Sequence, residues 1–247
     1  MKKLSISVYG SDARQQTLKA LLEKDGHTPA ENGEVCILPI PSPAIPPSCE
    51  DHRIILGGKL SAEFIDMCRQ RGVTARDVTV REDFAAANAA ICAEGAVMLA
   101  MEMTLRTVAG AEVLVIGYGR IGRLLCAKLR ALGAHVTAAA RKASDRAWIQ
   151  AEGHCSAHTG ELAEAVKGKS IVFNTVPARL TDGCVFEPDC LFIELATLPP
   201  GSETASASHP GLRLCDGRGL PARTSPVSAA EALRDTVYNV LREENMI

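Results

Sequence analysis

The sequence has few aromatic residues and almost no excess of charge. Aromatic residues make up 4% of its 247 residues, and 27 lysines and arginines stand against 29 aspartates and glutamates. Single-stranded nucleic acid is bound by aromatic stacking platforms, and both nucleic acid and anionic membrane surfaces attract basic proteins. The composition therefore predicts neither a nucleic-acid partner nor a membrane partner.

Closely spaced cysteines and long apolar runs are also missing. The nine cysteines are scattered, odd in number and never arranged as CxxC, so neither a disulfide framework nor a metal site is predicted. No uninterrupted run reaches the roughly 18 to 20 apolar residues that cross a bilayer, and the first residues do not resemble a secretory signal peptide. We therefore expect a cytoplasmic protein with reduced thiols.

What the chain does have is an alternation of short apolar strands with helices. The proline-rich residues 41–51 are predicted to form a loop. Around it, the first third of the chain is typical of a small parallel α/β unit. The strands are predicted over residues 4–9, 35–40, 53–56 and 78–80, and the helices over 13–24 and 62–71.

A long helix is predicted over residues 84–107, which are rich in alanine and methionine. The last helix is predicted to begin at Ser228, where Glu231 completes a capping box, and to end near residue 243. Strands and helices alternate between these two helices. The strands are predicted over residues 113–116, 135–140, 170–174, 191–195 and 213–215, and the helices over 121–132, 143–151 and 160–166.

A glycine-rich turn joins the strand over residues 113–116 to the next helix. Its GxGxxG pattern requires glycine for a tight turn, for close approach of a pyrophosphate to the backbone, and for packing of helix on strand. The phosphates then meet the free N–H groups and the positive end of the helix. We predict that this loop binds a nicotinamide dinucleotide. Its residues are Gly117, Tyr118, Gly119, Arg120, Ile121 and Gly122.

These elements predict an α/β protein of two units, the second a Rossmann-type doubly wound parallel sheet. The substrate-side domain is expected over residues 1–86 and the dinucleotide-binding domain over residues 87–226. The long helix links them. The C-terminal helix, within residues 227–247, is expected to return to the first unit.

The end of the following strand indicates which dinucleotide is bound. An NAD site usually carries Asp or Glu about 20 residues further on, bonded to the ribose 2′-hydroxyl. Here Arg141 and Lys142 stand at that point, and no acid appears before Asp145. The two cations match a 2′-phosphate, with Ser144 as a hydroxyl donor. We predict NADP, with NAD as the alternative.

Two further turns follow strands of the same predicted sheet. Ligands of doubly wound sheets lie beyond the carboxyl ends of the strands. Thr175, Val176 and Pro177 follow one strand, and Ala196 follows the next. We expect their backbone to line the nicotinamide ribose, unless both are purely structural turns.

Six segments, in order along nearly the whole chain, carry a family resemblance. They are residues 10–15 (GSDARQ), 93–100 (AEGAVMLA), 116–122 (IGYGRIG), 139–141 (AAR), 174–177 (NTVP) and 219–221 (GLP). The sequence is similar to the A-chain family of dipicolinate synthase. The first and last segments make the resemblance specific, because they are not general features of dinucleotide-binding folds. Around residues 39–50 the chain is shorter than is usual in the family.

The resemblance implies an enzyme that oxidises dihydrodipicolinate to dipicolinate, which is pyridine-2,6-dicarboxylate. It further implies a flavoprotein-like partner, the B subunit of dipicolinate synthase, and a role in the mother cell of a sporulating bacterium. We also expect the chain to form a homo-oligomer.

A dicarboxylate substrate needs cationic or hydroxyl donors. Arg14 follows the first strand, where Asp12 is placed to orient it or to handle a proton. Arg218 and Arg223 flank the late Gly-Leu-Pro turn, and Thr224 and Ser225 add hydroxyls there. Glu94 lies inside an apolar helix, so it is expected to face the substrate or to pair with an arginine. Each arginine could instead be an ordinary surface charge.

Two other functions remain open. A 2-hydroxyacid dehydrogenase needs a histidine as acid and base, and no His–Glu or His–Asp pair stands out among the six histidines. A regulatory module that binds NAD(P) without turnover would not need a second unit. Both observations favour ring oxidation by an NAD(P)-dependent oxidoreductase.

Overall fold

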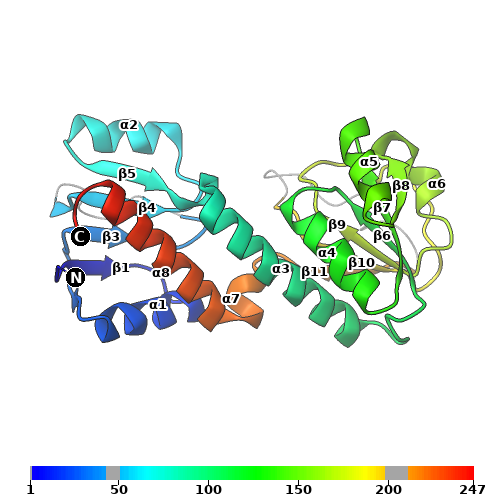
Figure 1. Cartoon of the computed structure of the whole chain (residues 1–247), viewed down its shortest axis with the longest axis horizontal. Helices are drawn as coiled ribbons and strands as arrows, with labels where there is room; N and C mark the ends of the chain where they lie inside the picture. The colour runs from blue at the N-terminus through cyan, green and yellow to red at the C-terminus, as the bar shows by residue number, and fades with distance from the viewer. Residues whose placement is uncertain (1, 43–50, 198–210) are drawn as a thin grey trace. The chain divides into compact units, whose positions relative to one another are not determined.

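The computed structural model describes residues 2–42, 51–197 and 211–247. Figure 1 shows the chain with its helices and strands labelled. The chain divides into two compact units. One consists of Met1–Asn88 with Pro221–Ile247, and the other of Ala89–Leu220. Each unit contains one parallel sheet with helices, so the predicted α/β class is confirmed.

The first unit is built on a five-stranded sheet. Its elements are β1 (Ser5–Val8), α1 (Ala13–Lys24), β2 (Thr28–Pro29), β3 (Val35–Ile37), β4 (Ile54–Gly57), α2 (Ala62–Gln70), β5 (Thr74–Asp77), the start of α3 (Glu82–Met103), most of α7 (Leu220–Thr224), and α8 (Pro226–Glu243). The strand order is β2-β1-β3-β4-β5, and every neighbouring pair is parallel.

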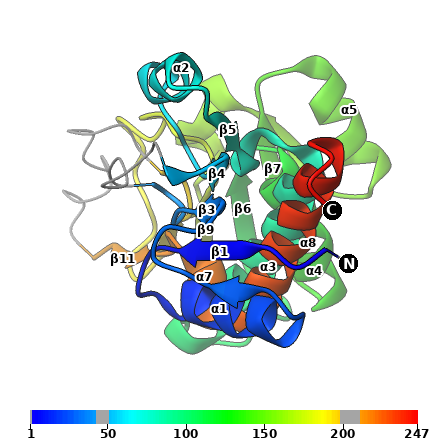
Figure 2. The same ribbon diagram turned by 90° about the vertical axis from the view of Figure 1, so that its left-hand side faces the viewer.

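Helices cover both faces of this sheet because its central strands are buried on both sides. On one face Leu18 of α1 and Leu233 of α8 join Ile37 of β3 in a single core. On the other face Phe64 of α2 packs near Ile55 of β4. Helices α1 and α8 lie side by side, with α2 apart from them (Figure 2). The C-terminal helix therefore belongs to the first unit.

The second unit is built on a six-stranded parallel sheet. Its elements are the rest of α3, β6 (Glu112–Ile116), α4 (Arg120–Ala131), β7 (His135–Ala140), α5 (Ala143–Ala151), β8 (Cys155–His158), α6 (Leu162–Ala165), β9 (Ile171–Asn174), β10 (Leu191–Glu194) and β11 (Arg213–Asp216). The order β11-β10-β9-β6-β7-β8 is that of the Rossmann fold, in which the direction of winding reverses between β6 and β9.

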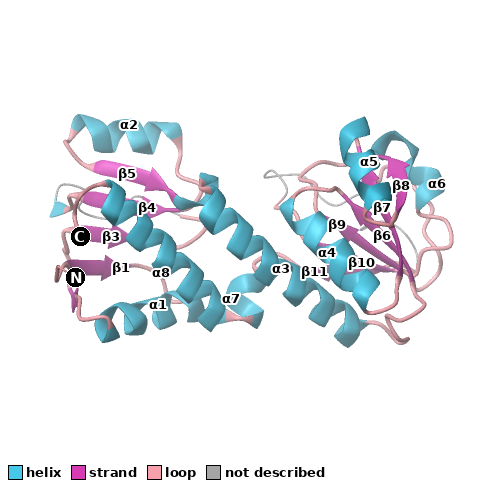
Figure 3. Ribbon diagram, in the orientation of Figure 1, coloured by secondary structure: helices cyan, strands magenta, loops and turns pink. Residues whose placement is uncertain are grey.

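Alternation along β6 fixes the two faces of this sheet. Val113 and Val115 pack with α3, α4 and α5. Leu114 and Ile116 pack with α6 on the opposite side. Figure 3 shows these helices and strands by type. The carboxyl ends of β6, β7, β9 and β10 thus meet at one edge of the sheet.

Helix α3 contributes to the cores of both units. Phe84 packs in the first core, and Ala93, Ala96 and Ala100 pack in the second. By length and composition alone, this helix is able to cross a membrane. However, 44% of its apolar 18-residue stretch is buried in the structure. A core helix of this kind meets the same criterion, so the finding is weak evidence for a membrane span.

Two boundary predictions are wrong for local reasons. Residues 78–80 form a 3-10 turn rather than a strand, because the Asp77 carboxylate accepts hydrogen bonds from the backbone N–H and the hydroxyl of Thr79. Helix α8 begins at Pro226, with Ser225 as N-cap, so Ser228 lies inside it. Proline suits the first turn because its missing N–H needs no partner there.

Other elements were not predicted. The strand β8 and the short helix α7 were assigned to loops, so the Gly-Leu-Pro segment leads into a helix rather than an extended loop. Most of the proline-rich loop, residues 43–50, lies outside the described residues.

Candidate dinucleotide-binding site

The three glycines after β6 have different structural roles. Gly117 has φ +100°, a conformation that favours glycine, and a Cβ there would overlap Thr175 and lie 2.7 Å from Cγ2 of Val176. A Cβ on Gly122 would overlap the carbonyl oxygen of Gly117. The protein itself therefore fills the space at both positions.

Gly119 is different because its missing side chain faces open space. Apart from its own neighbours along the chain, no heavy atom of the described residues would lie within 4 Å of a Cβ placed there. Gly119 is the N-cap of α4, and no side chain caps that helix end. The first N–H groups of a helix bind anions well. The loop thus leaves room where a pyrophosphate needs to approach the backbone, and its residues fit the cofactor.

Tyr118 anchors the loop to a neighbouring helix end. Its hydroxyl donates to Glu152 Oε2 at 2.5 Å, and Glu152 also forms an ion pair with Arg123 of α4. Burial and the adjacent Glu152 raise the pKa of the Tyr118 phenol, so it stays protonated as the donor. The Arg123 guanidinium lies 5.4 Å from the centroid of the Trp148 ring, in cation–π contact.

The turns after β9 and β10 are held by a buried amide–carboxylate pair. Asn174 Nδ2 donates to both carboxylate oxygens of Glu194 at 3.0 Å. The N–H groups of Val176 and Ala196 are bonded to Asn174 and Glu194 respectively. Burial raises the pKa of the Glu194 carboxyl, and these hydrogen bonds oppose the shift. Both turns were expected at this edge, but no pattern in the sequence indicated the pair that holds them.

Thr175 joins the turn after β9 to the end of β6, directly before the glycine loop. Its hydroxyl donates to the carbonyl oxygen of Ile116 at 2.8 Å, and its backbone N–H bonds the same oxygen at 2.9 Å. Pro177 in the same turn is exposed. Thr175 therefore fixes the spacing of β6 and β9 where the order of the sheet reverses.

The carboxyl end of β7 is basic and open. Arg141, Lys142 and Ser144 are all exposed. Within the described part of the chain, the side chains of Arg141 and Lys142 form no ion pair. Arg146, which sequence reasoning missed, donates to the carbonyl oxygens of Ala140 and Arg141 at 3.2 and 2.7 Å. This bond fixes the backbone from which Arg141 projects.

Comparison with known proteins supports the same use of this unit. Residues 79–185 match the family model for the NAD binding domain of D-isomer specific 2-hydroxyacid dehydrogenase. The A subunit of dipicolinate synthase from Bacillus subtilis (strain 168) is 31% identical over 195 residues, which are 78% of this chain and 66% of that protein, just under two thirds. Over this length the chain is similar to the A chain of dipicolinate synthase.

Solved structures of the family agree over almost the full length. The dipicolinate synthase A chain from Bacillus subtilis has a TM-score of 0.82 at 25% identity, covering 98% of this chain and 97% of the other. The corresponding protein from Bacillus halodurans has a TM-score of 0.81 at 24% identity, covering 96% and 97%. The second unit of this dipicolinate synthase homologue is thus an NAD-type dinucleotide-binding domain.

In the first unit, the dipicolinate synthase homologue buries two polar side chains after β1. Arg14 is 4% exposed and Gln15 is 1% exposed. Arg14 Nη2 donates to the carbonyl oxygen of Ile40 at 2.9 Å, but its Nε and both amide atoms of Gln15 have no hydrogen-bond partner within the described chain. Burial lowers the pKa of the Arg14 guanidinium, and Asp12 opposes this. The sequence analysis named Arg14 and missed Gln15.

The other predicted substrate residues already have structural roles. Asp12 caps α1 by accepting from the N–H of Gln15 at 2.9 Å and lies 3.9 Å from Arg14 Nη2. Arg218 makes a bidentate contact with Asp216 at 2.8 and 2.7 Å. Glu94 is exposed and pairs with Lys128 at 2.9 Å, so the expected arginine partner is wrong. Ser225 is the half-buried N-cap of α8.

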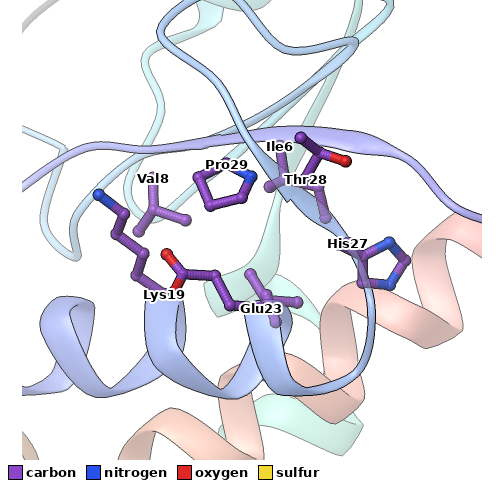
Figure 4. A pocket seen from close by; sticks show the side chains of 8 residues that line it. Ile6, Val8, Lys19, Glu23, His27, Thr28 and Pro29 are labelled. Atoms are coloured by element: carbon purple, nitrogen blue, oxygen red, sulfur yellow. The ribbon is translucent and has the colours of Figure 1, made fainter.

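A small cavity lies between α1 and the strands β1 and β2 (Figure 4). Its volume of about 10 Å³ is room for one water molecule at most. His27, on its wall, accepts from the N–H of Leu4 at 3.3 Å and has an unpartnered Nε2. This cavity is too small for a dicarboxylate.

Proposed function

We propose that this protein is the A subunit of a dipicolinate synthase and oxidises dihydrodipicolinate to dipicolinate with NADP⁺. The observation that carries the proposal is the glycine loop with open space over Gly119, beside the exposed cations at the end of β7. The family relationship supplies the reaction. We place this activity in the cytoplasm of the mother cell of a sporulating bacterium.

The reaction balances as a two-electron oxidation. One hydride leaves a ring carbon, one proton is released, and the dihydropyridine becomes an aromatic pyridine. When bound, the nicotinamide accepts the hydride. The protein binds the pyrophosphate at the N-terminus of α4 and holds the turns after β9 and β10 rigid through Asn174 and Glu194. Aromatisation makes the ring proton acidic, so only a weak base is needed.

We propose Arg14 as a contact for a substrate carboxylate. Its guanidinium keeps a free Nε–H, and a buried unsatisfied donor costs about 1–3 kcal/mol unless a partner arrives. Asp12 orients the Arg14 side chain. Arg218, Ser225 and Glu94 remain candidates, although a substrate carboxylate would have to displace Asp216 from Arg218.

The selectivity for NADP is tested by Arg141→Ala. A charge-assisted hydrogen bond is worth about 1.5–3 kcal/mol, so we expect NADPH to bind about tenfold more weakly or worse. NADH affinity should stay within about twofold, because its 2′-hydroxyl carries no charge to pair. The measurement is calorimetric titration of both dinucleotides, with Lys167→Ala as the control for a distant exposed cation. Equal losses for NADPH and NADH would show that Arg141 does not bind the 2′-phosphate.

The reaction is tested by following NADPH formation from dihydrodipicolinate, with and without the flavoprotein-like B subunit. We expect turnover in at least one condition. Titration of the two proteins also shows whether they bind each other and whether this chain self-associates. Absence of NADPH in both conditions, with the cofactor bound, would exclude the proposed reaction and leave a 2-hydroxyacid dehydrogenase or a regulatory module.

The alternative is a 2-hydroxyacid dehydrogenase, which the match of residues 79–185 favours. That chemistry needs a histidine as acid and base. His158 is used as a cap, accepting from the N–H of Gly160 at 3.1 Å, and His209 lies outside the described residues. Turnover of 2-hydroxyacids in the same assay would favour this alternative.

A further inference from the structure

A second cavity opens at the amino ends of β6, β7 and β8 in the second unit. Its volume is about 360 Å³, near the lower end of the roughly 300–1,000 Å³ typical of small-molecule pockets. Glu112 begins β6, His135 begins β7, and Cys155 begins β8, and all three line the cavity.

This cavity is separate from the dinucleotide site. Strand β6 runs from Glu112 at the cavity to Ile116, which directly precedes Gly117 of the loop. The strands are parallel, so their amino ends all lie at the edge opposite to the glycine loop. The proposed oxidation makes no use of this edge.

The charges on the cavity wall favour an anion. Lys169, whose side chain is 12% exposed, donates to Glu112 at 2.7 Å and to Thr137 at 3.1 Å. Arg130 donates to the backbone carbonyl of Glu152 and has no carboxylate partner within the described residues. The wall thus carries two cations and only one carboxylate, leaving one positive charge uncompensated before the histidines are counted.

His154 adds an unsatisfied polar atom to the same wall. It is 7% exposed, and its Nδ1 has no hydrogen-bond partner within the described chain. Its backbone N–H bonds the carbonyl oxygen of Ile149 at 3.0 Å, which holds it in place. Burial, with a further contribution from Arg130, lowers the pKa of the imidazole.

We propose that this cavity binds a small anionic metabolite through a phosphate or carboxylate group, held by Arg130 and Lys169 beside the His154 imidazole. The site takes one ligand per chain. It lies at the edge of the sheet opposite to the glycine loop.

The test is NMR titration of the His154 imidazole with inorganic phosphate and, separately, with glutarate. We expect a saturable shift and a rise in the His154 pKa, because a bound anion favours the imidazolium form. The other titratable groups on the cavity wall are Glu112, Arg130, His135, Cys155 and Lys169, and the adjacent Glu152 carboxylate raises the His154 pKa against the effect of Arg130. Chloride at matched ionic strength controls for screening. A response to one probe alone identifies the phosphate or the carboxylate as the recognised group.

The variant Arg130→Gln should weaken binding about tenfold, as expected for loss of one charge-assisted contact. Lys128→Gln, on the same helix but paired with Glu94, should leave it unchanged. No saturable shift with either probe, or an equal loss in both variants, would overturn the proposal. The readout at His154 does not depend on dinucleotide binding, so failure here is distinguishable from failure of the proposed oxidation.

Discussion

At the scale of single residues, two glycines of the same loop differ in the space beside their missing side chains. The space beside Gly122 is filled by backbone that has little freedom to move, whereas the space beside Gly119 is open. From the GxGxxG pattern we predicted a packing role for Gly122 and close approach of a pyrophosphate at Gly119. The structure shows which of them serves the fold and which leaves room for a ligand.

We expect Gly122→Ala to destabilise the protein by about 1–3 kcal/mol or more, because the new methyl group overlaps the carbonyl of Gly117. Gly119→Ala should change the free energy of unfolding by less than about 0.5 kcal/mol. It should nevertheless weaken dinucleotide binding at least tenfold. Thermal melting and calorimetric titration of the two variants provide the comparison. Unchanged affinity in Gly119→Ala would show that the pyrophosphate lies elsewhere.

The burial and pairing of several polar residues could not be predicted from the sequence. Arg14 was named as a candidate substrate contact because it is a cation after a strand-to-helix turn, but its burial was not predicted. Gln15 was not, because glutamine is mostly a surface residue and nothing adjacent signals its burial. The Asn174–Glu194 pair was equally hidden, since 20 positions separate two residues that only the sheet brings together.

At the scale of elements, the pattern of apolar residues predicted several bounds correctly, whereas the capping box assigned to Ser228 placed the start of α8 two residues too late. The residue bounds of α1, β7 and α5 agree with the prediction, and Ser61 caps α2 by accepting from Phe64 at 3.1 Å. Strand β8 was missed because its sequence, CSAH, is short and polar, as expected at the edge of a sheet. Periodicity cannot identify a strand that buries so little.

An ion-pair network joins the start of α3 to the end of α8 and gives a pH prediction. Arg81 bonds Asp83 at 2.9 Å and Glu243 at 2.7 Å. The hydrogen bond from Arg81 is the main reason that the pKa of Asp83 falls from 3.8 to about 2. A lowered pKa in the folded state means that this stabilisation is complete above about pH 4 and is lost as the pH falls towards 2.

We therefore expect the melting temperature of Asp83→Asn to lie below that of the unmodified protein near neutral pH, with the difference shrinking as the pH falls below about 4 and disappearing only below about pH 2. The measurement is thermal melting of both proteins across this range. Asp66→Asn, which removes an exposed ion pair on α2, is the control and should have little effect at any pH. A constant difference for Asp83→Asn would contradict the assignment.

At the scale of the whole molecule, each unit has a hydrophobic core of its own. Leu233 of α8 is buried in the first and Leu129 of α4 in the second. Replacing a buried leucine by alanine costs about 2–5 kcal/mol. The two cores should therefore respond separately to such substitutions.

Amide hydrogen exchange measures whether the two cores respond separately to these substitutions. Leu233→Ala should reduce protection in β1, β3 and β4, with β6 and β9 less affected, and Leu129→Ala should do the reverse. Equal loss throughout the chain in both variants would mean that the units unfold as one cooperative body.

The anchor of the glycine loop has an optical consequence. The sequence contains one tryptophan, and Trp148 is linked through Arg123 and Glu152 to Tyr118 in the loop. Tryptophan emission of the chain therefore comes from a single indole three contacts away from the glycine loop that we propose to bind the pyrophosphate. Reduced nicotinamide absorbs in the region where indole emits, so quenching of this emission reports occupancy of the loop without any added label.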